Sequence, residues 1–151
     1  MKELTGSGSA TTSASPADCM TLLEDIDRYP TWAPDIVKEA EVLERDAAGH
    51  PVKARTKLHV ERGPLTRDFN LVLDVKIDQT GTIALRRIPH RPTDQERFDV
   101  TWRVDGGQST RIALDLAANL DVPRFIPVGD VGDAMAQQLV SAATRALQSS
   151  A

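Results

Sequence analysis

The sequence has a single cysteine, Cys19, which excludes an internal disulfide bond. Basic residues are not in excess, because 18 lysines and arginines stand against 22 acidic residues and the net charge is −4. Nucleic-acid binding normally needs a basic surface that displaces counterions from phosphates. There is also no apolar run of about 18 residues, and the N-terminus has no signal-peptide-like apolar stretch. We therefore expect a soluble cytoplasmic protein with no nucleic-acid partner and no transmembrane segment.

Motifs of metal and phosphate chemistry are missing as well. The sequence has three histidines, His50, His59 and His90, and no two of them have the i, i+4 spacing of metal ligands on one helix face. The sequence contains no HExxH or CxxC pattern, so we expect no metal site. The GSGS run of residues 6–9 lacks the GK[ST] ending of a phosphate-binding loop. These absences predict a protein without a cofactor.

The length of the chain fits one domain over residues 1–151. A helix is expected to begin after Ser15, whose side chain can cap the first turn, with Pro16 at a position where no N–H is needed. This helix should break near Asp25 to Asp27, followed by a short turn before Pro30. Residues 29–34 then predict an irregular aromatic corner, because the residue before a proline disfavours helical angles.

From Ile36 to Leu120 the hydrophobic period is two, which is typical of strands with one buried face. The clearest alternating runs cover residues 52–60, 69–77, 98–104 and 110–118. Turn signals at residues 48–51, 63–64, 79–81, 89–92 and 105–107 leave no room for crossover helices. We therefore predict an antiparallel meander of about six strands.

After Pro127 the period returns to 3.6 residues, and Val131, Met135, Leu139 and Leu147 fall on one apolar stripe. About 20 residues would form a helix roughly 30 Å long, the only element long enough to cover the sheet. A straight helix does not fit a twisted sheet everywhere, so we expect an apolar gap between them. For residues 4–13, composition and propensity leave a flexible linker and a strand equally open.

Four stretches, taken together, resemble the START-like (SRPBCC, helix-grip) superfamily, the polyketide cyclase/dehydrase and lipid-transport group. They are SASPAD at residues 13–18, DIDRYPTWAP at residues 25–34, residues 98–112 and the Ala/Leu-rich helix after Pro127. The resemblance implies an α+β fold. In it a seven-stranded antiparallel curved sheet wraps around a long C-terminal helix, and a short broken helix follows the first strand. It also implies a cavity between sheet and helix, and it favours a strand at the N-terminus.

Side chains on the apolar registers are the candidates for binding a ligand in that cavity, although each could instead simply fill the core. They are Trp32, Phe69, Leu71, Phe98, Trp102, Leu114, Met135 and Leu139. Packing of the corner is the simpler role for Trp32, and core filling is the simpler role for Phe69 and Leu71. Thr56 and Thr110 are the polar residues on inward registers.

Two functions follow from the resemblance. The first is a carrier or binding protein for a small hydrophobic molecule such as a lipid, isoprenoid, quinone or polyketide-like aromatic, driven by burial of apolar area. The alternative is a polyketide cyclase/dehydratase-type enzyme, which needs a buried acid or base. The strand aspartates lie on the polar register, at Asp68, Asp74, Asp99 and Asp115. No catalytic constellation emerges, so whether the chain is an enzyme stays open. A protein-interaction module like the family's toxin or quinone-chaperone branches, and a homodimer, also stay open.

Overall fold

The protein is described here by a computed structural model covering residues 2–62, 65–120 and 129–149. Its elements are β1 (Lys2–Thr12), α1 (Pro16–Glu24), the 3-10 turn η1 (Ile26–Arg28), α2 (Tyr29–Trp32), β2 (Val37–Arg45), β3 (Pro51–Arg62), β4 (Leu65–Asp78), β5 (Thr82–Arg87), β6 (Arg97–Asp105), β7 (Thr110–Leu120) and α3 (Val131–Ser149). The predicted turn at residues 63–64 and the residues around Pro123 and Pro127 lie outside the described residues.

One antiparallel sheet holds all seven strands, in the order β1-β7-β6-β5-β4-β3-β2. Strands β2 to β7 therefore form the predicted meander, and β1 pairs with β7 along its whole length. The N-terminal segment is a strand, as the family resemblance implied, and the α+β helix-grip fold is confirmed.

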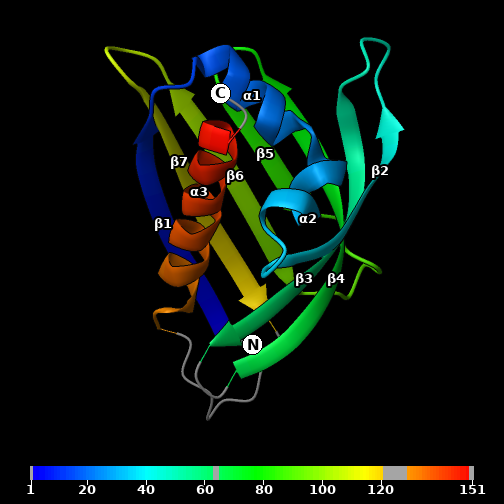
Figure 1. The fold of residues 1–151 in the computed structure, drawn as a ribbon. Helices are drawn as coiled ribbons and strands as arrows, with labels where there is room; N and C mark the ends of the chain where they lie inside the picture. Colours follow the sequence, from blue (N-terminus) through cyan, green and yellow to red (C-terminus); the bar gives the residue numbers. More distant parts are fainter. Residues whose placement is uncertain (1, 63–64, 121–128, 150–151) are drawn as a thin grey trace.

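The helices lie on one face of the curved sheet, with α3 nearest to β1 and β7, α1 in contact with α3 and β6, and α2 in contact with β2 (Figure 1). No helix in the described part of the chain is long and apolar enough to cross a membrane. The sheet and α3 therefore form two layers around a shared interior.

The strand alternation seen in the sequence matches the observed burial. On β6 the side chains of Phe98, Val100, Trp102 and Val104 are buried, while Arg103 is exposed. The β7 positions 110, 112, 114, 116 and 118 are buried in the same way. The inner face of the sheet is thus an apolar surface facing the helices.

The start of α1 is as predicted. The Ser15 side chain accepts a hydrogen bond from the Asp18 N–H at 3.1 Å, and Pro16 occupies the first turn. The prediction for Tyr29 to Trp32 was wrong, because these residues form α2 instead of an irregular corner. Pro30 lies in the first turn of α2, where a missing N–H costs nothing, and Tyr29 adopts helical angles of −51° and −40° despite preceding a proline.

The glycines of β1 allow its backbone to contact the backbone of α3. A Cβ atom at Gly6 would lie 2.0 Å from the Gly132 carbonyl carbon, and one at Gly8 would lie 2.8 Å from the Gln137 Cα. A Cβ atom at Gly132 would lie 2.2 Å from the Thr5 carbonyl oxygen. These distances are too short for any side chain, so the GSGS run is a helix-packing surface.

Two hydrogen bonds add to this contact. The backbone N–H of Ser7 donates to Asp133 Oδ1 at 3.0 Å, and that of Ser9 donates to Gln137 Oε1 at 3.3 Å. Because β1 is an edge strand, these bonds satisfy backbone donors with helix side chains instead of another strand. They fix where α3 lies along β1.

We predict that Gly6→Ala destabilises the fold by about 2 kcal/mol or more, because the new methyl group must push α3 away from β1. Gly129→Ala is the matched control, since a Cβ atom there would meet nothing within 4 Å. Urea unfolding measures both variants. Equal midpoints for the two would show that the close approach of α3 to β1 is not required.

Candidate functional site

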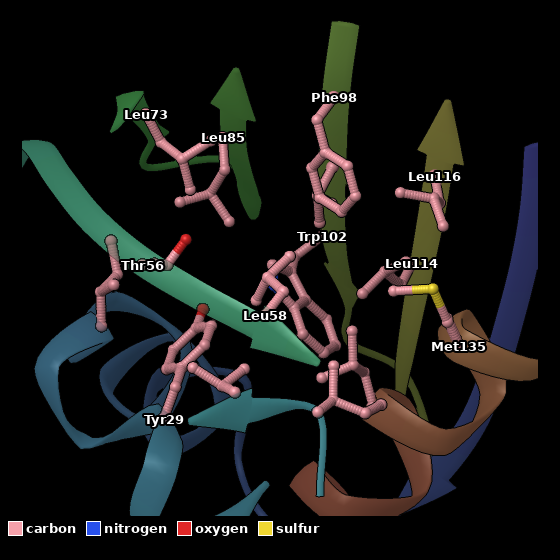
Figure 2. A pocket seen from close by; sticks show the side chains of 15 residues that line it. Tyr29, Thr56, Leu58, Leu73, Leu85, Phe98, Trp102, Leu114, Leu116 and Met135 are labelled. Atoms are coloured by element: carbon pink, nitrogen blue, oxygen red, sulfur yellow. The ribbon is translucent and has the colours of Figure 1, made fainter. Parts of the chain in front are cut away.

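An apolar cavity lies between the inner face of the sheet and the helices (Figure 2). About 50 Å³ of it is open to the centre of a water-sized molecule, whereas drug-sized ligands occupy sites of roughly 300–1,000 Å³. A hollow therefore exists, but it holds only a small guest without rearrangement of the side chains around it. Its lining consists of Ile26, Tyr29, Ile36, Val37, Thr56, Leu58, Leu73, Leu85, Phe98, Val100, Trp102, Leu114, Leu116, Met135 and Leu139.

Five of the eight candidate ligand residues line this cavity: Phe98, Trp102, Leu114, Met135 and Leu139. They come from β6, β7 and α3, so the strand and helix periodicities converge on one space (Figure 2). Trp102 is the largest of the fully buried side chains among the residues described.

The other three candidates lie outside the lining. Phe69 and Leu71 are buried on β4, where Leu73 is the lining residue, and the Arg67 guanidinium lies 4.6 Å from the Phe69 ring centroid. Trp32 packs against two lining residues, because its ring centroid lies 4.8 Å from that of Tyr29 and 6.4 Å from that of Trp102. These ring contacts agree with the simpler role considered for Trp32, which is packing of the aromatic segment 29–34.

Several lining residues were not singled out from the sequence. Leu58 and Val100 carry the same strand alternation as the chosen candidates and could have been found by it. Leu85 lies on β5, a strand of six residues whose pattern is too short to stand out. Ile26, Tyr29 and Ile36 belong to η1, α2 and the segment before β2, respectively. No local sequence pattern marks such short or irregular segments as part of a cavity.

Among the residues described, two side chains of the lining carry a polar oxygen, those of Tyr29 and Thr56. The Tyr29 hydroxyl donates to the Leu23 carbonyl oxygen at 2.5 Å, and burial raises the pKa of this phenol far above its ordinary value. Thr56 Oγ1 is buried and has no hydrogen-bond partner in the described part of the chain. Within the described part of the chain, the lining contains no carboxylate, histidine, lysine or arginine. By contrast, the Thr110 hydroxyl donates to the Ala14 carbonyl oxygen at 2.7 Å, outside this cavity.

A second, polar pocket adjoins the apolar cavity. About 300 Å³ of it is open to the centre of a water-sized molecule, and its lining includes Asp35, Lys38, His59, Glu61 and Gln138. The two pockets share the side chains of Ile36 and Met135. These two residues therefore form the wall between a charged outer pocket and an apolar inner cavity.

His59 is the titratable group of the outer pocket with the clearest partners. Its Nδ1 lies 2.6 Å from Asp68 Oδ1, and its Nε2 lies 3.4 Å from Glu61 Oε2. The hydrogen bond with Asp68, and then that with Glu61, raises the pKa of His59 above its ordinary 6.5. The same contact lowers the pKa of Asp68 below its ordinary 3.8.

The loop between β5 and β6 is organised by a partly buried ion pair between Arg87 and Asp94. Arg87 donates to Asp94 Oδ2 at 2.6 Å and to the Glu96 carbonyl oxygen at 2.8 Å. The hydrogen bond from Arg87 is the main cause that lowers the pKa of Asp94 well below its usual range. His90 and Arg91 line a surface hollow here that shares no residue with the apolar cavity. Among the residues described, no cluster of histidine, cysteine and acidic side chains could hold a metal ion.

Residues 12–148 match the family described as polyketide cyclase / dehydrase and lipid transport. Comparison with curated proteins gives no significant match.

Solved structures share the fold at low sequence identity. A START superfamily protein from Mycobacterium smegmatis is similar with a TM-score of 0.79 and 17% identity, over 97% of this chain and 99% of that chain. A protein from Thermus thermophilus gives 0.75 and 15%, over 97% and 99% of the two chains. An aromatase/cyclase from Streptomyces sp. R1128 gives 0.56 and 16%, over 98% and 88%. These similarities establish the fold of the chain.

We predict that Asp68→Asn moves the pKa of His59 back toward 6.5, because it removes the negative partner of the imidazolium. Titration of the His59 ring by NMR measures this. Asp74→Asn is the control, since Asp74 lies on the same strand opposite Lys53 and should leave His59 unchanged.

The same pair predicts a pH dependence of stability. The raised pKa of His59 stabilises the fold fully below pH 6.5, and this contribution disappears as the pH rises through the folded-state value. The lowered pKa of Asp68 stabilises the fold above pH 3.8 and ceases to do so as the pH falls through its folded-state value. The unfolding free energy of the wild type should therefore exceed that of Asp68→Asn by the largest amount between pH 3.8 and pH 6.5. A constant difference in unfolding free energy across the whole range would contradict the pairing.

Proposed function

Because the chain belongs to the polyketide cyclase / dehydrase and lipid transport family, we propose that it binds a small, largely apolar molecule beneath α3, as a carrier or binding protein. Lipids, isoprenoids, quinones and polyketide-like aromatics are the classes considered. The observation that carries the proposal is the apolar cavity between sheet and helix, whose lining offers two polar side-chain oxygens and no charge. Burial of apolar ligand surface would drive binding at about 25 cal/mol per Å².

The size of the cavity sets how a ligand could enter. A ligand of more than a few atoms must displace side chains of the lining. The wall shared with the outer pocket is where they can move, because free space lies on both sides of it. Met135 is part of that wall, and methionine side chains change shape at low cost. We propose that rotation of Met135 joins the two pockets, so that the ligand enters past Lys38 and His59.

The lining supports binding over cyclase-type or dehydratase-type catalysis. Proton transfer needs a positioned group with a pKa near the working pH. Among the described residues that line the cavity, Tyr29 is the one titratable side chain, and burial raises its pKa. It therefore stays neutral and serves as neither base nor strong acid.

The surface gives little support to a protein-interaction module. Such a module would carry a contiguous exposed apolar patch. Leu43 is the one large hydrophobic side chain that is exposed within the described ranges, at 40%. A single exposed leucine is ordinary for a protein surface.

Native mass spectrometry of protein purified from its own host tests the proposal. We expect a mass increment from a retained hydrophobic molecule, which organic extraction releases unchanged. Conversion of that molecule during incubation with the protein would favour the enzyme. A protein that never retains or takes up any apolar compound would contradict both.

We also predict that Val100→Phe fills the cavity and abolishes binding of toluene, followed by NMR titration. Val104→Phe is the matched control, because Val104 is buried on the same face of β6 but outside the lining. Without free space, Val104→Phe should cost about 1–3 kcal/mol in unfolding free energy, and Val100→Phe should cost less. Equal costs at the two sites would argue that no hollow exists next to Val100.

A further inference from the structure

Thr56 is a polar residue at a buried position of the sheet that faces the apolar cavity. It lies in β3 between Ala40 of β2 and Leu71 of β4, and its side chain reaches into the cavity from the sheet (Figure 2). The residue is 5% exposed, and its Oγ1 has no hydrogen-bond partner among the residues described. A buried hydroxyl without a partner destabilises a fold, so such groups are rare and call for an explanation.

Two other buried side-chain atoms in the described ranges share this lack of a partner, Trp32 Nε1 and Arg87 Nε. Neither residue lines the apolar cavity. Trp32 lies outside the lining, beside the Trp102 ring, and Arg87 is the last residue of β5 and lines the surface hollow near His90. Arg87 also has other hydrogen bonds through its guanidinium, to Asp94 and Glu96. Thr56 alone of the three places an unused hydrogen-bonding atom where a guest would lie.

We propose that Thr56 determines ligand specificity by donating a hydrogen bond from its hydroxyl to an oxygen atom at the buried end of the ligand. The ligand is then an apolar molecule with a carbonyl or hydroxyl oxygen on its inner part, rather than a pure hydrocarbon. This inference rests on the proposed function and narrows its ligand class. Thr56 is a binding residue here, and no covalent step is involved.

The neighbouring hydroxyl does not replace Thr56 in this role. The Tyr29 hydroxyl already donates its proton to the Leu23 carbonyl oxygen at 2.5 Å, so toward the cavity it can only accept. A threonine hydroxyl can rotate and either donate or accept. The indole N–H of Trp102, the other donor of the lining, is directed to the Tyr29 hydroxyl. Among the lining residues described, Thr56 therefore has the free donor, which suits an acceptor oxygen on the ligand.

A trapped water molecule is the competing explanation. The cavity is large enough for one, since a water needs roughly 10–15 Å³ by this measure and about 50 Å³ is open. A buried water, however, is held by about two to four polar partners. Of the two polar side-chain oxygens of the described lining, that of Tyr29 already donates to the Leu23 carbonyl oxygen and accepts from the Trp102 indole, which leaves Thr56 as the side-chain partner for a water. An oxygen carried on an apolar skeleton satisfies Thr56 and fills the remaining space as well.

The test compares two probes of nearly the same shape, acetophenone and α-methylstyrene, which differ by a carbonyl oxygen in place of a methylene group. Binding of each to the full chain is measured by NMR titration for the wild type, Thr56→Val and Thr56→Ser. Thr56→Val keeps the branched shape and removes the hydroxyl, whereas Thr56→Ser keeps the hydroxyl. Thermal unfolding of each free variant shows that it is folded and whether removing the hydroxyl stabilises it.

We expect Thr56→Val to weaken acetophenone binding by about fivefold or more, the worth of one hydrogen bond, and to change α-methylstyrene binding by less than about twofold. Thr56→Ser should keep the acetophenone affinity within about threefold of the wild type. The melting temperature of free Thr56→Val should equal or exceed that of the wild type.

Three results would overturn the inference. If Thr56→Val affects both probes alike, the cavity binds ligands but Thr56 does not select them, and the proposed function stands. If Thr56→Val lowers the melting temperature and leaves the difference between the probes unchanged, water satisfies the hydroxyl. If the wild type binds neither probe, the inference falls together with the proposed cavity function.

Discussion

The backbone contact between α3 and β1 determines where the interior of this protein can be hollow. Gly6, Gly8 and Gly132 bring helix and strand closer than any residue with a Cβ atom would permit. Hydrogen bonds from the N–H groups of Ser7 and Ser9 to α3 side chains then hold the helix in register with the edge of the sheet. Because α3 is fixed at this edge, it cannot also lie flat on the strands in the middle of the sheet.

The remaining space is closed from the other side. η1 and α2 pack against β2, and the Trp32 ring lies between those of Tyr29 and Trp102, tilted against the first and edge-to-face with the second. What is left between this aromatic group and α3 is an apolar cavity. On its sheet side lies the Thr56 hydroxyl, which has no hydrogen-bond partner among the residues that the structure describes. Its other boundary, at Ile36 and Met135, is also the boundary of a charged pocket. The arrangement favours a molecule that is apolar, carries an inner oxygen and enters from a polar rim.

Regular periodicity predicted most of the fold and part of the site. Alternation on β6 and β7 identified Phe98, Trp102 and Leu114, and the helical stripe identified Met135 and Leu139, all of which line the cavity. Alternation fixes which face a side chain occupies but not how far along the strand the cavity extends. It gives Phe69, Leu71 and Leu73 the same inward face, and of these Leu73 lines the cavity. Composition also hid the role of residues 6–9, because a flexible linker and a glycine contact surface have the same residues. Only the tertiary contact with α3 distinguishes them.

The central claim is that an apolar hollow persists beneath α3 in the folded protein. A crystal structure determined under xenon pressure measures this most directly, because xenon occupies dry apolar cavities and needs no assumption about the natural ligand. The account predicts a xenon site enclosed by Trp102, Leu114 and Met135. Fully interlocked side chains at that place, with no xenon bound at any pressure the crystals tolerate, would contradict it.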